Sequence, residues 1–491
     1  MNVVIVGGGS SGWMTASMLA RLVGKQHQIT LIESDDVATV GVGEATIPPI
    51  AYFNKVLGIN EADFIKKTQG SFKLGIEFDG WKQAGHVYMH AFGRIGKDMG
   101  MAGFHHTWLR GKAAGIDSDL WDYSLNYQAA KNNKFGFLPT IPNTKLPGLV
   151  HAYHFDAGLY ANYLRELSEE MGVVRIEGFI SSVNTAPVSG FIESVSLQSG
   201  DVIEGDFFID CSGFRALLIE GALKTGYEDW RHWLPCDSAV AMPCERVDPI
   251  IPYTKSIAHK AGWQWRIPLQ HRTGNGLVFA SEFMTDEEAI EYLKTNVDGK
   301  PLGEPRLIKF KTGRRTKQWH KNCVAIGLSS GFLEPLESTS LHLVQSAIVR
   351  LVKMFPHKQM NEVQVDEYNR QSKIEFERIR DFIILHYKVN GRDEPFWQRM
   401  KDMPIPDSLA LKIRLFEQTG TIFREQDELF TEAGWQQVFI GQGIEPSCYH
   451  TLADSLSEGQ LEELLQNLST IMQGTAARLP EHSDILAQMT K

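Results

Sequence analysis

The spacing of apolar residues at the start of the chain alternates between strand-like and helix-like. Residues 2–6 (NVVIV) are almost continuously apolar, which is typical of a strand buried on both faces of a parallel sheet, and residues 28–32 predict a second strand of this kind. The segment between them has helical spacing through Thr15, Met18, Leu19 and Leu22. This order predicts a strand–helix–strand unit of an α/β fold.

The turn between the first strand and the helix is rich in glycine. Gly7, Gly9 and Gly12 form G-x-G-x-x-G, which allows a tight turn and the close approach of a pyrophosphate to the helix N-terminus. Glu33 ends the second strand, 21 residues after Gly12, where a carboxylate can accept hydrogen bonds from ribose hydroxyls. We therefore expect a bound dinucleotide; the alternative is a glycine-rich turn without a ligand.

The G-x-G-x-x-G fingerprint alone does not distinguish an FAD-binding site from an NAD-binding site. A second glycine-terminated strand lies far downstream at residues 207–213, and residues 325–327 (AIG) form a further segment that ends in glycine. This discontinuous layout resembles that of large FAD-dependent monooxygenase-like proteins. Residues 41–48, which include Glu44 and Ala45, are either a loop along the flavin or an ordinary strand–helix connection.

A lysine lies within a strand-like segment further along the chain. Phe72, Leu74, Ile76 and Phe78 alternate at period two, so we expect one strand with an apolar face. Lys73 would share the other face with Gly75. A lysine on a strand is usually solvated, but the adjacent glycine leaves room for a ligand or a tunnel.

A second turn suited to anions spans residues 331–340 (GFLEPLESTS). It follows the apolar run 323–328, expected to be a buried strand, and precedes a helix expected from residue 341 to 348. The loop between a strand end and a helix start collects free backbone N–H groups and a positive dipole. Because Glu337 lies in the same turn, we expect it to act with a partner elsewhere in the chain.

Two tryptophans share one face of another expected strand. Trp263 and Trp265 are spaced i,i+2 within residues 262–268, so they form a bulky wall or ordinary packing. After Pro356 the chain is expected to be mainly helical, with apolar helical spacing over residues 363–387 and 459–472 that predicts core and lid helices.

Composition excludes several classes of function. A net charge of −10 argues against a nucleic-acid or anionic-membrane surface, and no apolar run approaches the ~18 residues that would span a membrane. The five cysteines are widely spaced without a CxxC, and no signal peptide precedes the first strand, so we expect reduced thiols and a cytoplasmic protein. No metal is expected, because the spacing of the histidines completes no ligand pattern: His86, His90, His105, His106, His151 and His154.

These motifs together resemble those of the flavin-dependent tryptophan halogenases, and the resemblance covers nearly the whole chain. The matching pieces are Gly7-x-Gly9-x-x-Gly12, residues 72–76 (FKLGI), residues 263–268 (WQWRIP) and Phe332-x-x-Pro335-x-x-Ser338. Residues 209–215 and 381–387 are also similar to the family.

The resemblance implies a mechanism and its cofactors. FADH2, supplied by a separate flavin reductase, would react with O2, and chloride or bromide held at Thr339 and Ser340 would be oxidised to hypohalous acid. Lys73 would deliver the electrophilic halogen, by a hydrogen bond or as a haloamine. Glu337 would take the proton from the arenium intermediate as a general base.

Further site residues follow from the same resemblance. It places Glu44, Ala45, Leu328 and Leu341 beside the cofactor, in addition to the fingerprint residues. It implies a substrate-side set that walls the substrate from the flavin and stacks its indole: His90, Phe92, Trp263, Trp265 and Ser338.

One residue departs from the family pattern. The family usually has glycine where this chain has Ser340, at a position whose backbone N–H is expected to hold the halide. If that position required a positive φ, serine there would cost about 1 kcal/mol. We expect a modified halide pocket, with a preference shifted towards bromide.

We expect an FAD-binding Rossmann-like domain interleaved with a substrate domain and followed by a mainly helical C-terminal part. The expected segments are 1–110 (first FAD-binding part with the lysine strand), 111–220 (mixed, with a second FAD-domain segment), 221–305 (substrate-side cover), 306–355 (FAD and halide) and 356–491 (helical lid). The expected substrate is tryptophan, indole or an indole derivative. Monomer and homodimer both stay open.

Two alternatives share the fingerprint. An FAD-dependent aromatic hydroxylase would have no use for Lys73 with Glu337 or for the tryptophan pair. A non-catalytic flavin-binding protein would not need to retain Lys73 and Glu337.

Overall fold

The computed structural model describes residues 1–36, 43–357 and 360–491. The chain divides into two compact units, each assembled from three separate stretches. The first comprises Met1–Gly70, Phe155–Ser238 and Ile308–Glu377, and the second comprises Ser71–His154, Ala239–Leu307 and Arg378–Lys491. The five segments expected from the sequence stay a prediction.

The first unit contains most of the short strands. Its elements are β1 (Asn2–Val6), α1 (Ser10–Val23), β2 (Gln28–Glu33), β3 (Gly43–Ala45), α2 (Pro49–Leu57), α3 (Glu61–Lys67), α6 (Ala157–Glu170), β8 (Val174–Glu177), β9 (Ile180–Thr185), β10 (Ile192–Leu197), β11 (Val202–Glu204), β12 (Phe207–Asp210), η2 (Gly213–Arg215), the π-helix η3 (Leu217–Ala222), β13 (Tyr227–Asp229), β20 (Gly313–Arg315), β21 (Trp319–His320), β22 (Cys323–Ala325), η4 (Gly327–Ser329), β23 (Gly331–Phe332), η5 (Pro335–Glu337) and α8 (Ser340–Lys353).

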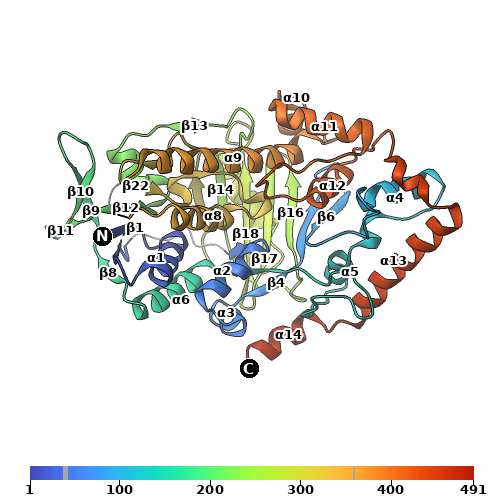
Figure 1. Ribbon diagram of the computed structural model, residues 1–491, viewed down its shortest axis with the longest axis horizontal. Helices are drawn as coiled ribbons and strands as arrows, with labels where there is room; N and C mark the ends of the chain where they lie inside the picture. The colour runs from blue at the N-terminus through green and yellow to red at the C-terminus, as the bar shows by residue number, and fades with distance from the viewer. Residues whose placement is uncertain (37–42, 358–359) are drawn as a thin grey trace. The chain divides into compact units, whose positions relative to one another are not determined.

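A parallel sheet forms the centre of this unit. Its strands lie in the order β22-β12-β1-β2-β8, all parallel, and β21 pairs antiparallel with β22. The chain order reverses between β1 and β12, and in such sheets ligands bind at the carboxyl ends of the strands beside this switch point. Helix α1 packs against α6 and α8 (Figure 1). The predicted α/β class with a Rossmann-like sheet is confirmed.

Asp210, the last residue of β12, is the main polar anchor in the core of this unit. Its side chain is fully buried and accepts four hydrogen bonds. One carboxylate oxygen accepts from the backbone N–H (3.0 Å) and the hydroxyl (2.6 Å) of Ser212, and the other accepts from the N–H groups of Leu218 and Ile219, both at 2.8 Å. The carboxylate therefore satisfies the N-terminal amides of η3, which no longer need water.

The second unit is organised around long antiparallel strands. Its elements are β4 (Ser71–Lys73), β5 (Gly75–Asp79), β6 (Val87–Ala91), α4 (Phe104–Ala113), η1 (Leu120–Tyr123), α5 (Leu125–Lys131), β15 (Cys244–Glu245), β16 (Thr254–His259), β17 (Gly262–Pro268), β18 (Arg272–Phe279), α7 (Asp286–Thr295), α10 (Pro395–Asp402), α11 (Asp407–Thr419), α12 (Glu432–Gly441), η6 (Thr451–Ser455), α13 (Glu458–Arg478) and α14 (His482–Met489). The elements β7 (Ala152–Asp156), β14 (Ser238–Ala241), β19 (Arg306–Lys309) and α9 (Glu362–Lys388) cross from one unit into the other.

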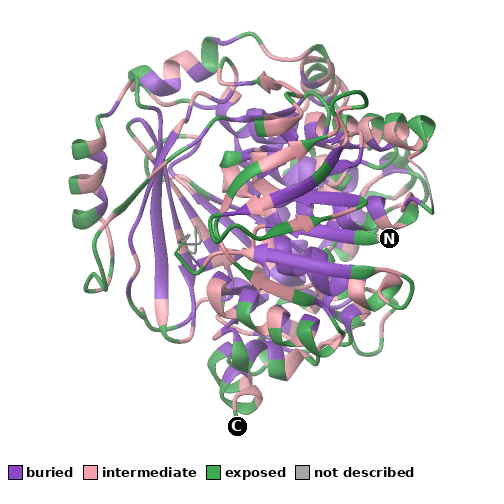
Figure 2. Ribbon diagram, turned by 90° about the vertical axis from the view of Figure 1, so that its left-hand side faces the viewer, coloured by how far each residue is buried: buried purple, intermediate pink, exposed green. Residues whose placement is uncertain are grey.

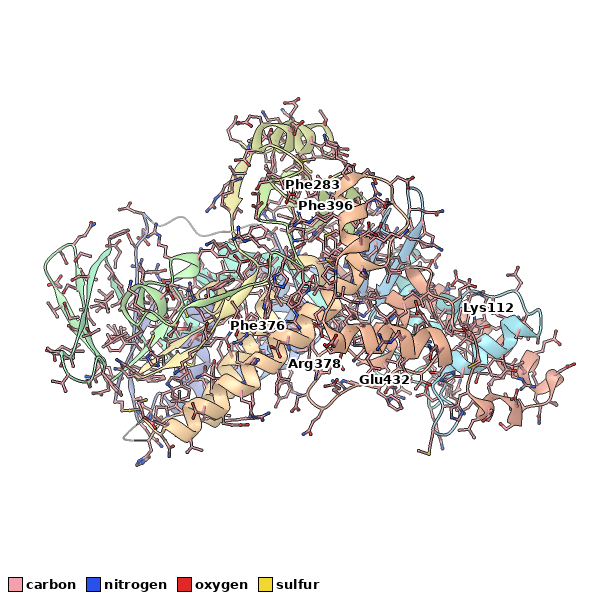
Figure 3. The ribbon with its side chains drawn as sticks, turned by 90° about the horizontal axis from the view of Figure 1, so that it is seen from above. Lys112, Phe283, Phe376, Arg378, Phe396 and Glu432 are labelled. Carbon is pink, nitrogen blue, oxygen red and sulfur yellow. The ribbon has the colours of Figure 1, made fainter. Side chains whose placement is uncertain are left out.

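The strands that lie wholly in the second unit have the order β18-β17-β16-β5-β6, with β15 on β18, and β14 and β19 continue the same sheet beyond β18. From β18 to β6 all neighbours are antiparallel except β16 and β5. Sheet strands are mostly buried, and exposed residues gather on helices and loop ends (Figure 2). α10 is anchored by Phe396, whose ring meets that of Phe283 edge-on with centroids 5.7 Å apart (Figure 3).

The expected single strand across residues 72–78 is wrong. The structure has two strands, β4 and β5, which meet at Leu74 and pair with different partners: β4 with β7, and β5 with β6 and β16. The Leu74 amide instead donates to the carbonyl of Pro252 at 2.7 Å. The segment thus passes from one sheet into another, and both faces of its strands are buried. Lys73 is 0% exposed rather than solvated.

The helical C-terminal part is confirmed: after Phe332 the residues that the structure describes form helices α8 to α14 and no strand. The helices expected at residues 341–348, 363–387 and 459–472 correspond to α8, α9 and α13. Within the described ranges, no helix combines the length and apolar character needed to cross a bilayer.

We expect Asp210→Asn to lower the free energy of unfolding by about 2–5 kcal/mol, because a carboxamide presents its NH2 to two buried N–H donors. Urea titration of the purified protein measures this. Asp206→Asn is the control, since that exposed carboxylate accepts one hydrogen bond, from the Asn2 amide. Equal losses in the two variants would contradict the anchoring role of Asp210.

Candidate active site

The glycine fingerprint lies at the carboxyl end of β1 and at the N-terminus of α1. Gly7 has φ +110°, and a Cβ there would lie 2.3 Å from the carbonyl oxygen of Cys211. A Cβ at Gly12 would lie 1.8 Å from the carbonyl oxygen of Gly7. These two glycines are therefore required by the close packing of β1, β12 and α1.

Gly9 is different, because a Cβ there would meet no atom within 4 Å. It is the N-cap residue of α1, and no side chain caps the helix. The first amides of a helix have no intrahelical acceptor, and here they lie at an open, glycine-lined end. This arrangement fits the pyrophosphate of a dinucleotide.

Glu33 ends β2 beside the same turn. One of its carboxylate oxygens accepts a hydrogen bond from Nε of Arg175 at 2.6 Å. The other lies next to Gly8, where a Cβ would come within 1.5 Å of it. The carboxylate is thus held in a fixed position next to the fingerprint, which fits the expected contact with a ribose.

Four further predicted cofactor residues lie in the first unit. Glu44 and Ala45 are in β3, while Gly41 and Val42 of the same predicted loop lie outside the described residues. Burial and the nearby Asp156 raise the pKa of Glu44 to about 7. Leu328 lies in η4 and Leu341 in the first turn of α8.

The turn predicted to hold the halide is a 3₁₀ turn followed by a helix N-terminus. Glu337, fully buried, ends η5. Ser338 has φ +57°, in the left-handed region, and Thr339 is the N-cap of α8. Ser340 is the first helical residue of α8 and has no positive φ, so serine at this position brings no left-handed strain.

The hydroxyl of Thr339 is buried and has no hydrogen-bond partner among the residues that the structure describes. Its backbone carbonyl already accepts the amide of Leu343 at 2.9 Å, as an N-cap residue requires. A buried hydroxyl beside the free amides of a helix N-terminus fits a small anion. A halide therefore fits the residues present.

In the second unit, Lys73 ends β4 among aromatic residues. Its Nζ lies 5.5 Å from the centroid of the Phe92 ring, and the whole residue is buried. The two residues before it are anchored by histidines. The Phe72 amide donates to Nε2 of His482 at 3.1 Å, and the Ser71 hydroxyl lies 3.0 Å from Nδ1 of His154.

Both histidines are neutral. The Ser71 hydroxyl donates its one proton to the carbonyl of Pro268 at 2.6 Å, so it must accept from Nδ1–H of His154. Burial, the charge of Lys73 and His482 together hold the pKa of His154 well below its usual value. Burial lowers the pKa of His482 to about 4. Lys73 therefore lies on a strand anchored by uncharged imidazoles, so neither His154 nor His482 places a second positive charge beside it.

Three of the predicted substrate-side residues, His90, Trp263 and Trp265, share one face of the sheet. Trp265 is the register partner of Ser256 on β16 and of Gly276 on β18, and Ser256 in turn pairs with Phe78 on β5. Register partners project from the same face, as do residues two apart along a strand. Trp263, two residues before Trp265, therefore lies on this face.

His90 and the residues that anchor the Lys73 strand lie on the same face of the sheet, at the neighbouring register positions. His90 is the register partner of Ile76, and Ile76 is the partner of Thr254. The Thr254 hydroxyl lies 2.9 Å from Nε2 of His154. The sheet therefore brings His90, the tryptophan pair and the anchors of the Lys73 strand onto one surface.

The indole of Trp265 lies directly over Gly276. A Cβ at Gly276 would lie 2.0 Å from Cζ2 of the tryptophan ring. The Trp265 ring lies edge-on to that of Trp263, with centroids 6.2 Å apart, and its buried Nε1 has no hydrogen-bond partner in the described part of the chain. Gly276 thus determines where this wall of the site lies.

Sequence reasoning missed Gly276, Thr254, His154 and His482 as parts of the site. A glycine inside a strand often indicates that another group approaches the backbone closely, so the sequence could have indicated a contact at Gly276. No local signal marks His482, because its partner Phe72 is 410 positions away.

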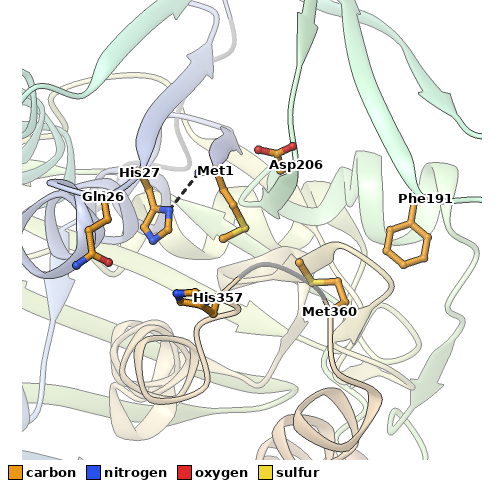
Figure 4. Close-up of a pocket in the computed structure, with 7 residues that line it drawn as sticks. All are labelled: Met1, Gln26, His27, Phe191, Asp206, His357 and Met360. Atoms are coloured by element: carbon orange, nitrogen blue, oxygen red, sulfur yellow. Dashed lines mark hydrogen bonds between the residues drawn. The ribbon is translucent and has the colours of Figure 1, made fainter.

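A surface cavity of about 580 Å³ lies elsewhere in the first unit (Figure 4). Its lining includes Met1, His27 and Asp206, which precede β1, β2 and β12. It is therefore at the amino ends of the parallel strands, opposite the fingerprint. No group of three or more potential metal ligands occurs among the described residues.

We expect Gly276→Ala to destabilise the protein by about 1–3 kcal/mol, because the added methyl overlaps the Trp265 ring. Trp265→Phe removes the overlapping atoms, so the double variant should lose less than the sum of the two single variants. Denaturant titration of the four proteins of this cycle measures the coupling. Strict additivity would show that the ring moves freely away from Gly276.

Glu44 should make stability depend on pH. Its pKa is raised in the folded state to about 7, so its contribution is fully present below its ordinary value of 4.5 and is lost as the pH rises through 7. The slope should reach at most about 1.4 kcal/mol per pH unit. Thermal unfolding of Glu44→Gln, compared with the exposed control Glu193→Gln, should show a flatter dependence only for the first variant.

Comparisons with known proteins identify the family of this chain. Residues 2–458 match the family model of the tryptophan halogenases. Tryptophan 7-halogenase RebH from Lentzea aerocolonigenes is 36% identical over 439 residues, covering 84% of this chain and 81% of the relative. Tryptophan 6-halogenase ThaL from Streptomyces albogriseolus is 32% identical over 480 residues, covering 90% of each chain.

Solved structures are more similar still. Xcc4156, a flavin-dependent halogenase from Xanthomonas campestris, is 47% identical with a TM-score of 0.96, covering 99% of this chain and 98% of that chain. BrvH, a flavin-dependent halogenase from Brevundimonas sp. BAL3, is 43% identical with a TM-score of 0.96, covering 100% and 99%. The chain therefore belongs to the tryptophan halogenase family and is a flavin-dependent halogenase.

Proposed function

We propose that this enzyme uses FADH2 from a separate reductase, O2 and chloride or bromide to halogenate an indole-type aromatic: tryptophan, indole or an indole derivative. The observation that carries the proposal is the fully buried amine of Lys73, held beside Phe92 on a strand with neutral anchors. Support for the indole class comes from relatives named as tryptophan halogenases.

The flavin, when bound in its reduced form, would supply two electrons to O2, and the halide would supply the other two, which gives hypohalous acid and water. We assign the pyrophosphate to the N-terminus of α1 at Gly9, with Glu33 at the ribose. Glu44, Ala45, Leu328 and Leu341 complete the proposed cofactor set. The Thr339 hydroxyl and the N-terminal amides of α8 at Ser340 would hold the halide.

We assign Lys73 the delivery of the electrophilic halogen, by a hydrogen bond or as a haloamine. The aromatic carbon bonds to the halogen, and the resulting arenium ion loses its proton to Glu337, a positioned general base. Water is the other product. Trp263, Trp265 and Ser338 are the proposed wall, and His90 and Phe92 are the proposed indole contacts.

The preference for bromide expected from Ser340 stays a proposal. The proposed preference rests on the size and the hydrogen-bond donors of the halide pocket. It does not rest on backbone strain, because Ser340 is helical. A cytoplasmic location and the choice between monomer and homodimer stay predictions.

We expect Lys73→Ala to lower halogenation by at least about 10²–10⁴-fold, because the halogen-directing amine is lost, while FAD binding is retained. Turnover is measured with reductase, FAD, NADH and bromide against a panel of indoles, with product detected by its mass shift. Lys66→Ala, at an exposed lysine of α3, is the control. Retained halogenation in Lys73→Ala would refute the assigned role.

A further inference from the structure

Helix α12 lies beside β6, the last strand of the second-unit sheet (Figure 1). Glycines on α12 allow this close approach. A Cβ at Gly434 would lie 3.0 Å from Nε2 of His90, and one at Gly441 would lie 2.3 Å from the ring of Tyr88. The two glycines are seven residues apart, so they mark one face of the helix. Gln437 lies between them.

The Gln437 side chain pairs with both backbone polar groups of Ala91. Its Oε1 accepts the Ala91 amide at 2.9 Å, and its Nε2 donates to the Ala91 carbonyl at 3.1 Å. The second proton of Nε2 is donated to the carbonyl of Ala433, also at 3.1 Å. Gln437 is 1% exposed, and both of its bonds to Ala91 are buried. The carboxamide thus occupies the place of a further strand at the sheet edge.

On their other side, residues 90–92 are hydrogen-bonded to the chain that follows Lys73. The Phe92 amide donates to the carbonyl of Leu74 at 2.8 Å, and Leu74 directly follows Lys73. Gly75 allows β5 and β6 to approach closely, because a Cβ there would lie 2.7 Å from the carbonyl oxygen of His90. Residues 90–92 are therefore held between the Lys73 strand and Gln437.

We propose that Gln437 is a positioning residue, which sets the place of His90 and Phe92 and thereby the orientation of the aromatic substrate relative to Lys73. The proposal rests on the proposed function. Gln437 acts through the backbone of Ala91, so its effect should appear in where the substrate is halogenated and how often delivery succeeds, rather than in flavin binding.

Gln437→Met keeps the length of the side chain and removes both bonds to Ala91. Using the full-length enzyme with reductase, FAD, NADH, bromide and indole, we expect kcat/KM to fall by about 10- to 100-fold, as a displaced reacting group would cause. The ratio of monobrominated isomers should change, and less product should form per FADH2 oxidised. The matched control is Gln436→Met, the same substitution at the next buried position of α12. Equal changes in both variants would overturn the proposal, because the effect would then come from disturbing α12 and not from losing the bonds to Ala91.

Gln437→Glu separates the hydrogen bonds from helix packing. The ionised carboxylate accepts the Ala91 amide but cannot donate to its carbonyl, whereas a protonated carboxyl offers one donor and one acceptor, as glutamine does. The isomer ratio should therefore return towards that of the wild type as the pH falls from about 8 to about 6, since burial raises a carboxyl pKa. A ratio that stays constant with pH in this variant would contradict the proposal.

Hydrogen exchange tests the contact without turnover. The Ala91 amide should exchange at least about tenfold faster in Gln437→Met than in the wild type, and unchanged exchange would overturn the proposal. If the wild type halogenates no indole of the panel while exchange responds as expected, the proposed function fails and the structural contact stands.

Discussion

The second unit depends on keeping one ammonium group buried. Moving an ammonium from water into a protein interior costs several kcal/mol unless its surroundings are fixed and complementary. Lys73 has the face of Phe92 within 5.5 Å, and its strand is anchored by His154 and His482. Both imidazoles are uncharged, so they hold the strand without adding repulsion. The amine of Lys73 is thus held in place beside an aromatic ring in the interior of the unit.

In the proposed function, the first unit binds negative charge at the N-termini of α1 and α8, where backbone amides carry partial positive charge. Gly7 and Gly12 bring the elements together, and Gly9 keeps the surface open. At α8 the buried Thr339 hydroxyl is a further candidate donor. Both proposed anion sites therefore use the same physical feature, the free amides of a helix N-terminus.

The departure at Ser340 illustrates how position decides the effect of a substitution. The residue that adopts the left-handed conformation is Ser338, two positions earlier, whereas Ser340 begins α8. Serine is well tolerated in the first turn of a helix, where its hydroxyl can reach an unpaired amide. The replacement therefore changes the lining of the turn and leaves its backbone intact.

The sequence by itself determined the features that local patterns carry. The fingerprint glycines, the apolar strands at 2–6 and 28–32, the helices after Pro356 and the shared face of Trp263 and Trp265 follow from spacing alone. The resemblance to the tryptophan halogenases added the candidate residues Lys73, Glu337 and Thr339, because the motifs that contain them are contiguous in the sequence. The tertiary structure decided the split of the 72–78 segment into β4 and β5 and the complete burial of Lys73. It also decided the roles of His482 and Gln437. Their partners lie far away along the chain, 346 positions in the case of Gln437 and Ala91. Hydrogen bonds and ring contacts at that separation depend on which strands pair, and no local periodicity encodes that pairing.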